Sequence, residues 1–180
     1  ALGRTTSADP TRFVSVLLGK GDGTFQMPIN SSGKWGQGSG PYSIAVGDFD
    51  RDGKTDLAVT DEFLTVLRGN GDGTFKTPAA PMALLNTSTD VKVSDFNGDG
   101  KPDVATANFD AATASVMLNL TTSGASTPTF VFKTDFTVGT APTSVALADL
   151  NGDDKPDLAT ANSNGNSASV LLNSTATGTF

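Results

Sequence analysis

Oxygen-bearing side chains recur at a fixed spacing in three short stretches of this sequence, and that arrangement suits the binding of a hard metal cation. The stretches are DFDRDGKTD (48–56), DFNGDGKPD (95–103) and DLNGDDKPD (149–157), each with Asp or Asn at the first, third, fifth and ninth positions. Alternation in a tight loop turns these side chains toward one centre, and Ca²⁺ prefers oxygen ligands of this kind. The pattern therefore predicts three calcium loops with one ion in each.

The seventh residue of each stretch is Lys, whose backbone carbonyl is expected to face the ion while its side chain points outward. The ninth-position Asp is expected to close the site, because no Glu stands at the twelfth position. The candidate ligands are Asp48, Asp50, Asp52, Lys54 (carbonyl) and Asp56 in the first loop, Asp95, Asn97, Asp99, Lys101 (carbonyl) and Asp103 in the second, and Asp149, Asn151, Asp153, Lys155 (carbonyl) and Asp157 in the third.

The sixth position separates the third loop from the other two. Gly53 and Gly100 allow the positive φ that a sharp turn requires, whereas Asp154 stands there in the third loop, which is expected to be the weakest site. An alternative is that all three stretches are Asp/Asn/Gly turns without a metal, because these residues favour turns. Three copies in register, each with the ninth-position Asp, favour the metal.

Composition excludes several classes of chemistry. The chain has no His and no Cys, which rules out Ser-His-Asp and Cys-His triads, the usual zinc sites and thiol redox chemistry. The acids outside the loops form no convincing catalytic pair, so no enzymatic activity is predicted. The net charge is -7, and no basic cluster or apolar run of about 20 residues is present, which argues against a nucleic-acid partner and a membrane span.

The elements that must position the loops are short strands in a repeated unit. A second motif follows each Asp-rich stretch, in LTVLRGNGDGTF (64–75), ASVMLNLTTSGASTPTF (114–130) and ASVLLNSTATGTF (168–180), and a further copy, VSVLLGKGDGTF (14–25), stands alone near the start. Small apolar segments such as 43–47, 57–60, 144–148 and 158–161 indicate strands, and no long segment has a helical period. A repeat of about 40–50 residues with four strands is typical of a β-propeller blade.

The two motifs together resemble the FG-GAP/VCBS repeats, which occur in the α-subunit propeller of integrins and in many secreted bacterial proteins. The resemblance covers almost the whole chain, and it implies an all-β fold of four-stranded antiparallel blades in a propeller that usually has seven. It also implies a Ca²⁺ loop between the first two strands of a blade, with the ligands named above. The chain is then one propeller segment (1–180), made of the back half of a blade (1–30) and three blades (31–80, 81–136 and 137–180).

About three and a half blades are too few to close a ring and leave sheet edges open. We therefore expect a fragment of a larger propeller, or completion by another segment or another chain; two copies would sum to seven blades. The expected function is that of a secreted or cell-surface bacterial scaffold that binds protein or carbohydrate, with calcium in a structural role. The alternatives are a lectin with glycan pockets between blades and a non-catalytic module attached to an enzyme.

Two aromatic residues are weaker candidates for contact with a ligand. Trp35 lies in the Gly- and Ser-rich stretch NSSGKWGQGSGPY (30–42), which Tyr42 ends. An exposed aromatic ring there could stack on a sugar. The alternative is that Trp35 packs between blades, since large aromatic side chains usually bury most of their area.

Overall fold

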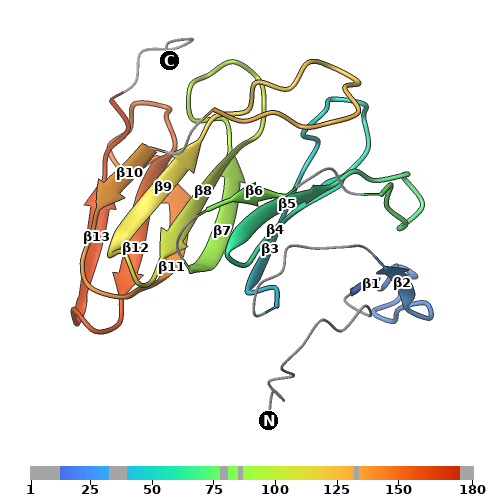
Figure 1. The fold of residues 1–180 in the computed structure, drawn as a ribbon, viewed down its shortest axis with the longest axis horizontal. Coiled ribbons are helices and arrows are strands. Elements are labelled where there is room, and N and C mark those ends of the chain that lie inside the picture. The colour runs from blue at the N-terminus through green and yellow to red at the C-terminus, as the bar shows by residue number, and fades with distance from the viewer. Residues whose placement is uncertain (1–12, 33–39, 78–80, 85–86, 132–133, 175–180) are drawn as a thin grey trace.

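The computed structural model describes residues 13–32, 40–77, 81–84, 87–131 and 134–174. These residues form strands joined by turns and loops, which confirms the all-β prediction, and they include no helix long and apolar enough to cross a membrane. The strands (Figure 1) are β1 (Phe13–Val16), β2 (Ile29–Ser32), β3 (Ser43–Gly47), β4 (Asp56–Thr60), β5 (Phe63–Leu67), β6 (Met82–Ala83), β7 (Ser88–Ser94), β8 (Asp103–Asn108), β9 (Thr113–Met117), β10 (Thr134–Thr137), β11 (Pro142–Ala148), β12 (Asp157–Asn162) and β13 (Ser167–Leu171).

The strands form four antiparallel sheets, and in each sheet the neighbours are also neighbours in the sequence. The sheets are β1-β2, β3-β4-β5-β6, β7-β8-β9-β10 and β11-β12-β13. Short connections between antiparallel strands account for this order. The predicted strands at 43–47, 57–60, 144–148 and 158–161 lie within β3, β4, β11 and β12, and are confirmed.

The first two strands of the last three sheets share one register. Gly47 pairs with Asp56, Ser94 with Asp103, and Ala148 with Asp157. In each case the first Asp of the loop directly follows one strand, and the ninth-position Asp begins the next. The Asp-rich stretch is therefore the connection between the first two strands of its sheet, and pairing of the strands brings both ends of the stretch together.

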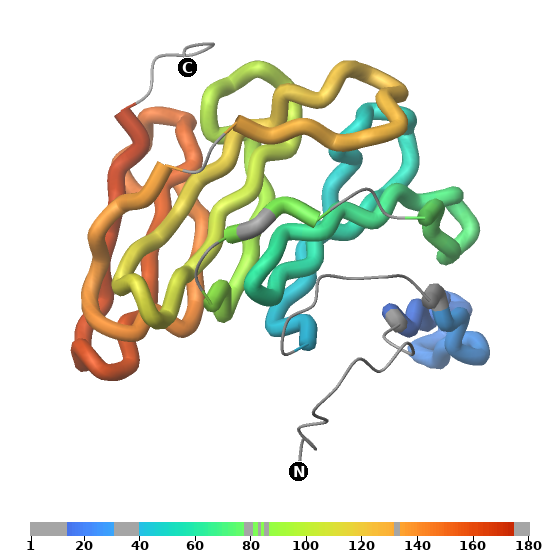
Figure 2. The backbone as a smooth tube through the Cα atoms, viewed as in Figure 1, coloured from blue at the N-terminus to red at the C-terminus, as the bar shows by residue number. Residues whose placement is uncertain are grey.

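The sheets lie one beside the next (Figure 2), and clusters of buried apolar side chains join neighbouring sheets. Phe49, the second residue of the first loop, is fully buried in a cluster with Val91 and Val104 of the following sheet, and its ring meets Phe130 edge-on at 5.9 Å. Phe96 of the second loop packs in the same way in a cluster with Val145 and other residues of the next sheet. Each of the first two loops thus inserts an aromatic side chain between its own sheet and the following one.

One carboxylate connects the first strands of three successive sheets. Asp90 on β7 accepts hydrogen bonds from the hydroxyl of Ser43 on β3 (3.0 Å) and from the hydroxyl of Ser144 on β11 (3.0 Å). It also accepts the backbone N–H of Val145 (3.0 Å) and pairs with Lys92 at 2.8 Å. The side chain is largely buried, so these bonds hold β3, β7 and β11 together away from most of the solvent.

Candidate metal centre

The three Asp-rich loops share a backbone conformation, which explains how Asp154 fits where the other loops have Gly. The φ angle at the sixth position is 82° at Gly53, 78° at Gly100 and 62° at Asp154. All three values lie in the left-handed region, which Gly enters freely and Asp enters more readily than most residues. The fourth position is left-handed as well, with φ of 52° at Arg51 and Gly in the other two loops, a feature that the sequence analysis did not predict.

Backbone amides within each loop turn the acidic side chains inward. Asp48 accepts the N–H of Asp52 at 3.0 Å and that of Gly53 at 2.9 Å. Asp50 also accepts the N–H of Asp52 (3.1 Å), and Asp52 accepts that of Lys54 (3.0 Å). The second and third loops repeat these four bonds at 2.7–3.1 Å. The loop itself therefore orients the oxygens of positions one, three and five.

The ninth-position Asp is fully buried and ties the loop to its sheet. One of its carboxylate oxygens accepts the N–H of the second loop residue, and the other accepts an N–H from the residue that lies two positions after the third strand. Asp56 accepts the N–H groups of Phe49 (2.9 Å) and Gly69 (2.8 Å). Asp103 accepts those of Phe96 (2.8 Å) and Asn119 (2.7 Å), and Asp157 accepts those of Leu150 (2.9 Å) and Asn173 (2.8 Å).

Burial makes two of these carboxylates costly to ionise. Burial raises the pKa of Asp56, and the neighbouring carboxylates of Asp50 and Asp48 add to the increase against two opposing backbone hydrogen bonds. Burial likewise raises the pKa of Asp103 to about 6, with further contributions from the acids of its own loop. Because like charges at this distance disfavour each other's ionised form, a cation among them is stabilising.

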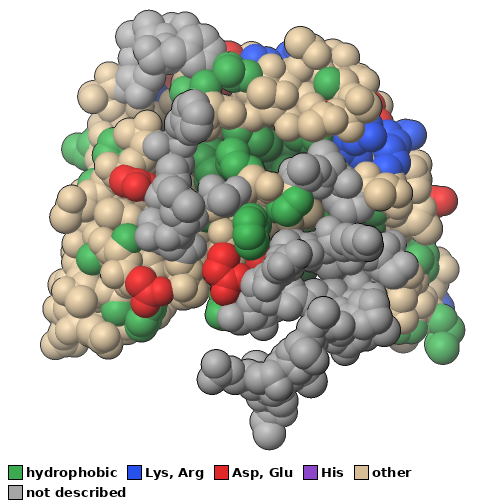
Figure 3. Space-filling view, viewed as in Figure 1, with side chains coloured by type: hydrophobic (Ala, Val, Ile, Leu, Met, Phe, Trp, Pro, Cys, Tyr) green, Lys and Arg blue, Asp and Glu red, His purple; other side chains and the backbone are tan. Residues whose placement is uncertain are grey.

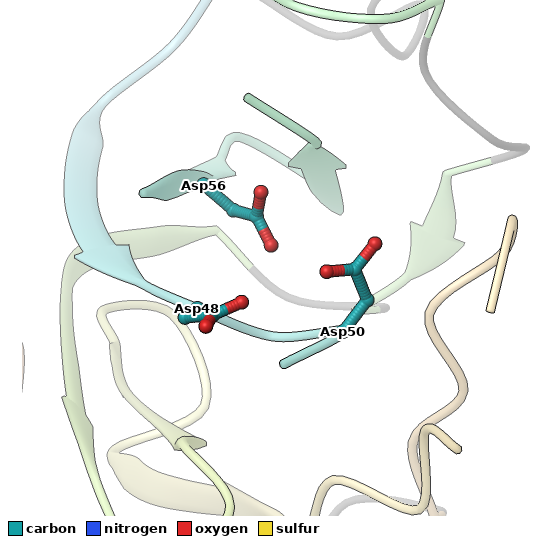
Figure 4. Close-up of side chains that lie close together, drawn as sticks. All are labelled: Asp48, Asp50 and Asp56. Atoms are coloured by element: carbon teal, nitrogen blue, oxygen red, sulfur yellow. The ribbon is translucent and has the colours of Figure 1, made fainter. Parts of the chain in front are cut away.

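Three carboxylates converge in the first loop, as Figure 4 shows. One oxygen each from Asp48, Asp50 and Asp56 lies within 4.8 Å of the other two. Oxygens that surround one Ca²⁺ at 2.3–2.6 Å are at most about 5 Å apart, so the spacing fits a single ion. In the other loops Asn97 and Asn151 offer an amide oxygen at the third position. Coordination by the fifth-position Asp residues and by the Lys carbonyls stays a prediction.

Two cations approach the first loop from outside it. Lys76 lies 3.1 Å from the carboxylate of Asp52, and Arg68 lies 3.4 Å from that of Asp50. The hydrogen bond from Lys76 is the main cause of the lowered pKa of Asp52. The sequence analysis missed both cations, although comparison of the repeats would have marked position 68, where the other two have Leu.

In the second and third loops the cation comes from the loop itself. Lys101 lies 3.0 Å from Asp99, and Lys155 lies 3.5 Å from Asp153. The expectation that these Lys side chains point outward is wrong, because each folds back over the carboxylate two residues before it. For Asp99, burial raises the pKa, but the hydrogen bonds from the side chain and the backbone N–H of Lys101 help to outweigh it, and the pKa is lowered.

Each of the first two loops is held by an Asn from the following sheet. The amide of Asn119 donates to the carbonyl of Phe49 (3.0 Å), and that of Asn173 donates to the carbonyl of Phe96 (2.9 Å). The connection after Asn119 also reaches the first loop, where the N–H of Gly124 and the hydroxyl of Ser123 donate to the carbonyls of the third and fourth residues. The shared place of the two Asn residues in the second motif is the sequence signal for this contact.

The third loop differs from the others in exposure. The second and third residues, Leu150 and Asn151, are exposed, whereas their counterparts in the other loops are buried. Among the residues that the structure describes, no sheet follows β11–β13 to cover this loop. The exposure of this loop is a second reason, besides Asp154, to expect weaker binding there.

Ligand contact by the two aromatic residues stays a prediction. Trp35 lies outside the described residues, and Tyr42 is 48% exposed with its backbone N–H bound to the carbonyl of Thr60. A cavity of about 360 Å³ opens between the last two sheets, where Phe96, Leu118 and Leu171 are among its lining side chains. This mainly apolar lining suits an apolar group better than a sugar, which needs polar partners.

Comparison with known proteins agrees with the repeats seen in the structure. A model described as FG-GAP-like repeat matches the chain three times, at residues 5–59, 57–106 and 95–160. A search of curated proteins found no match. The three matches overlap, and together they span most of the sequence.

Proposed function

The chain belongs to the FG-GAP-like repeat family, and on that premise we propose that its three Asp-rich loops bind Ca²⁺, one ion each, in a repeat module for interaction with other molecules. The observation that carries the proposal is the convergence of Asp48, Asp50 and Asp56 within 4.8 Å. The same inward turn of side chains in the other two loops supports two further sites. Repeats of this family are typically non-catalytic, and we propose a structural role for the metal.

The bound ion would supply positive charge at the point where the loop gathers its carboxylates. Residues of the chain connect the loop to the neighbouring strands and sheets. The ninth-position Asp links the loop to the third strand of its sheet, and Asn119 and Asn173 link the first two loops to the sheets that follow. A loop that is held in one conformation therefore fixes the position of the next sheet.

Thermal unfolding tests this proposal. Protein stripped with EDTA should melt at a lower temperature than protein in millimolar CaCl₂, because a ligand at 100 times its Kd stabilises the native state by about 2.7 kcal/mol per site. At about 2–4 °C per kcal/mol for a chain of this size, one such site raises the melting temperature by about 5–10 °C. Isothermal titration should give a stoichiometry of about three.

A variant with a matched control makes the test specific. Asp52→Ala should lower the stoichiometry by one ion, whereas Asp110→Ala, which removes an exposed acid outside the loops, should leave it unchanged. The proposal fails if elemental analysis finds no metal in the calcium-treated protein and the melting temperature does not respond to EDTA.

We further propose that the sheets are blades of a β-propeller and that further repeats, from this chain's continuation or from another chain, complete it. Leu150 is 51% exposed, whereas Phe49 and Phe96 at the same loop position are 0% and 7% exposed because a following sheet covers them. Val170 and Leu172 are exposed on the same sheet. Light scattering tests association, since a monomer at all concentrations would exclude completion by a second copy.

The location and the ligand class belong to the same proposal. Repeats of this family are typical of extracellular or cell-surface proteins, where millimolar calcium would keep sites of modest affinity filled. We propose that the loops and turns bind a protein or a carbohydrate. A glycan array probed with and without calcium distinguishes the two, since absence of binding to every glycan favours a protein ligand.

A further inference from the structure

Two positions change together among the three repeats, and in the first repeat they lie in contact. One is the third residue of the Asp-rich loop, and the other is the first residue after the third strand of the same sheet. The pairs are Asp50 with Arg68, Asn97 with Leu118, and Asn151 with Leu172. The residue after the third strand is therefore a cation only in the repeat whose third loop position is a carboxylate.

The contact between the first pair is largely buried. Asp50 is 1% exposed, and one of its oxygens accepts the N–H of Asp52. Its other oxygen faces the guanidinium of Arg68, which also donates to the carbonyl of Ala125 at 3.3 Å. Arg68 is thus held between the first loop and the long connection of the next sheet, and its charge is little screened there.

The second pair, Asn97 and Leu118, has no cation at the position of Arg68, and the amide nitrogen of Asn97 differs accordingly from the carboxylate of Asp50. Asn97 occupies the place of Asp50 and accepts the N–H of Asp99 in the same way. Its amide nitrogen, buried next to the second loop, has no hydrogen-bond partner in the described part of the chain. Leu118, which stands where the first repeat has Arg68, offers none. Among the described residues, an ion pair between these two positions is formed only by Asp50 and Arg68.

We propose that Arg68 is the counter-cation of the first loop, which holds Asp50 in place without calcium and lowers the calcium affinity of that loop. The inference rests on the proposed calcium function. The extra carboxylate of Asp50 would otherwise make the first loop the tightest of the three sites, and Arg68 offsets that charge. On the face that Figure 3 shows, the largest group of Lys and Arg side chains lies at the upper right, on the side of the β3–β6 sheet.

The expected size follows from the charges involved. A monovalent cation near a divalent ion repels it at the effective dielectric constant of a protein surface, and rearrangement removes only part of that repulsion. Removal of Arg68 should therefore tighten calcium binding at the first loop by at least about tenfold. Lys76 is more exposed than Arg68, and its removal should have a smaller effect.

Site-resolved calcium titration by NMR tests the proposal. The sixth-position amides of Gly53, Gly100 and Asp154 donate to the first-position carboxylates at 2.9, 2.7 and 2.9 Å, so each reports on its own loop. In Arg68→Leu, the midpoint of the Gly53 shift should move to at least about tenfold lower calcium, while that of Gly100 stays where it is in the wild type. Lys20→Leu, which removes an exposed charge outside the three Asp-rich loops, should move neither midpoint.

A double variant covers the case in which Arg68→Leu does not fold. Asp50→Asn with Arg68→Leu recreates the pair of the second loop, and it should restore the calcium-free melting temperature and give Gly53 a midpoint close to that of Gly100. The inference is overturned if the calcium midpoint of Gly53 is the same in Arg68→Leu as in the wild type. If Arg68→Leu does not fold, the inference is overturned when the double variant has the same Gly53 midpoint as Asp50→Asn alone. Failure of all three amides to respond to calcium in the wild type would instead overturn the calcium function itself.

Discussion

Replacing Asp90 with Ala tests whether three sheets depend on one carboxylate. Its side chain is 14% exposed and accepts hydrogen bonds from Ser43 on β3 and from Ser144 and Val145 on β11. Three such bonds at about 0.5–1.5 kcal/mol each give an expected loss of about 3 kcal/mol in the free energy of unfolding. At about 2–4 °C per kcal/mol, the melting temperature should fall by about 6–12 °C.

Urea denaturation measures this loss, and a second acid provides the control. Asp110 is exposed and accepts one hydrogen bond, from the hydroxyl of Thr87 at 2.6 Å. Its replacement by Ala removes the same charge from the surface and should change the free energy of unfolding by no more than about 0.5 kcal/mol. A loss at Asp90 that is no larger than the loss at Asp110 would refute the reasoning.

The pKa of Asp90 leads us to expect that its contribution to the free energy of unfolding depends on pH. Burial raises the pKa of Asp90, but the hydrogen bonds from Lys92, Val145, Ser144 and Ser43 outweigh it and lower the pKa below the ordinary value. A lowered pKa in the folded state means stabilisation that is present above the unfolded pKa of about 3.9 and is lost as the pH falls through the folded pKa. The stability difference between wild type and Asp90→Asn should therefore shrink below about pH 4, and a constant difference would contradict this assignment.

Two further substitutions test the packing around the loops. Asn119→Ala leaves two carbonyls without the side-chain amide that now binds them, and it should lower the free energy of unfolding by about 2–4 kcal/mol, measured in urea; a loss under about 0.5 kcal/mol would show that the link between sheets is dispensable. Gly69→Ala would place a Cβ 2.1 Å from the carbonyl oxygen of Thr55 and should cost about 2 kcal/mol or more. Gly19→Ala, at the same motif position with open space around it, is the control, and equal effects at both glycines would count against steric crowding.

Local sequence patterns predicted the parts of this structure that depend on neighbouring residues. The strands follow from short apolar segments, and the inward turn of the loop side chains follows from hydrogen bonds between residues two to five positions apart. The left-handed sixth position was foreseen even at Asp154, since Asp accepts that conformation.

Contacts between distant residues were not predictable in the same way. Arg68 and Lys76 reach acids 18 and 24 residues earlier in the chain, and no periodicity links such pairs. The fold-back of Lys101 and Lys155 was missed for a different reason, because a flexible side chain pairs with whichever carboxylate is nearest once the loop has formed. The bridging role of Asp90 needed the packing of three sheets, although the Ser–Asp–Ser series at 43, 90 and 144 was visible in the aligned repeats.

The Asn contacts between sheets can form only after the later repeat has been synthesised. Asn119 follows Phe49 by 70 residues, and Asn173 follows Phe96 by 77. A ribosome that adds about 5–20 residues per second needs about 4–14 s to synthesise the first of these intervals. During translation, each of these loops must therefore wait, with its carbonyl bound to water, until the following repeat has emerged. The contact at Phe49 can therefore form before the contact at Phe96, since Asn119 is synthesised before Asn173.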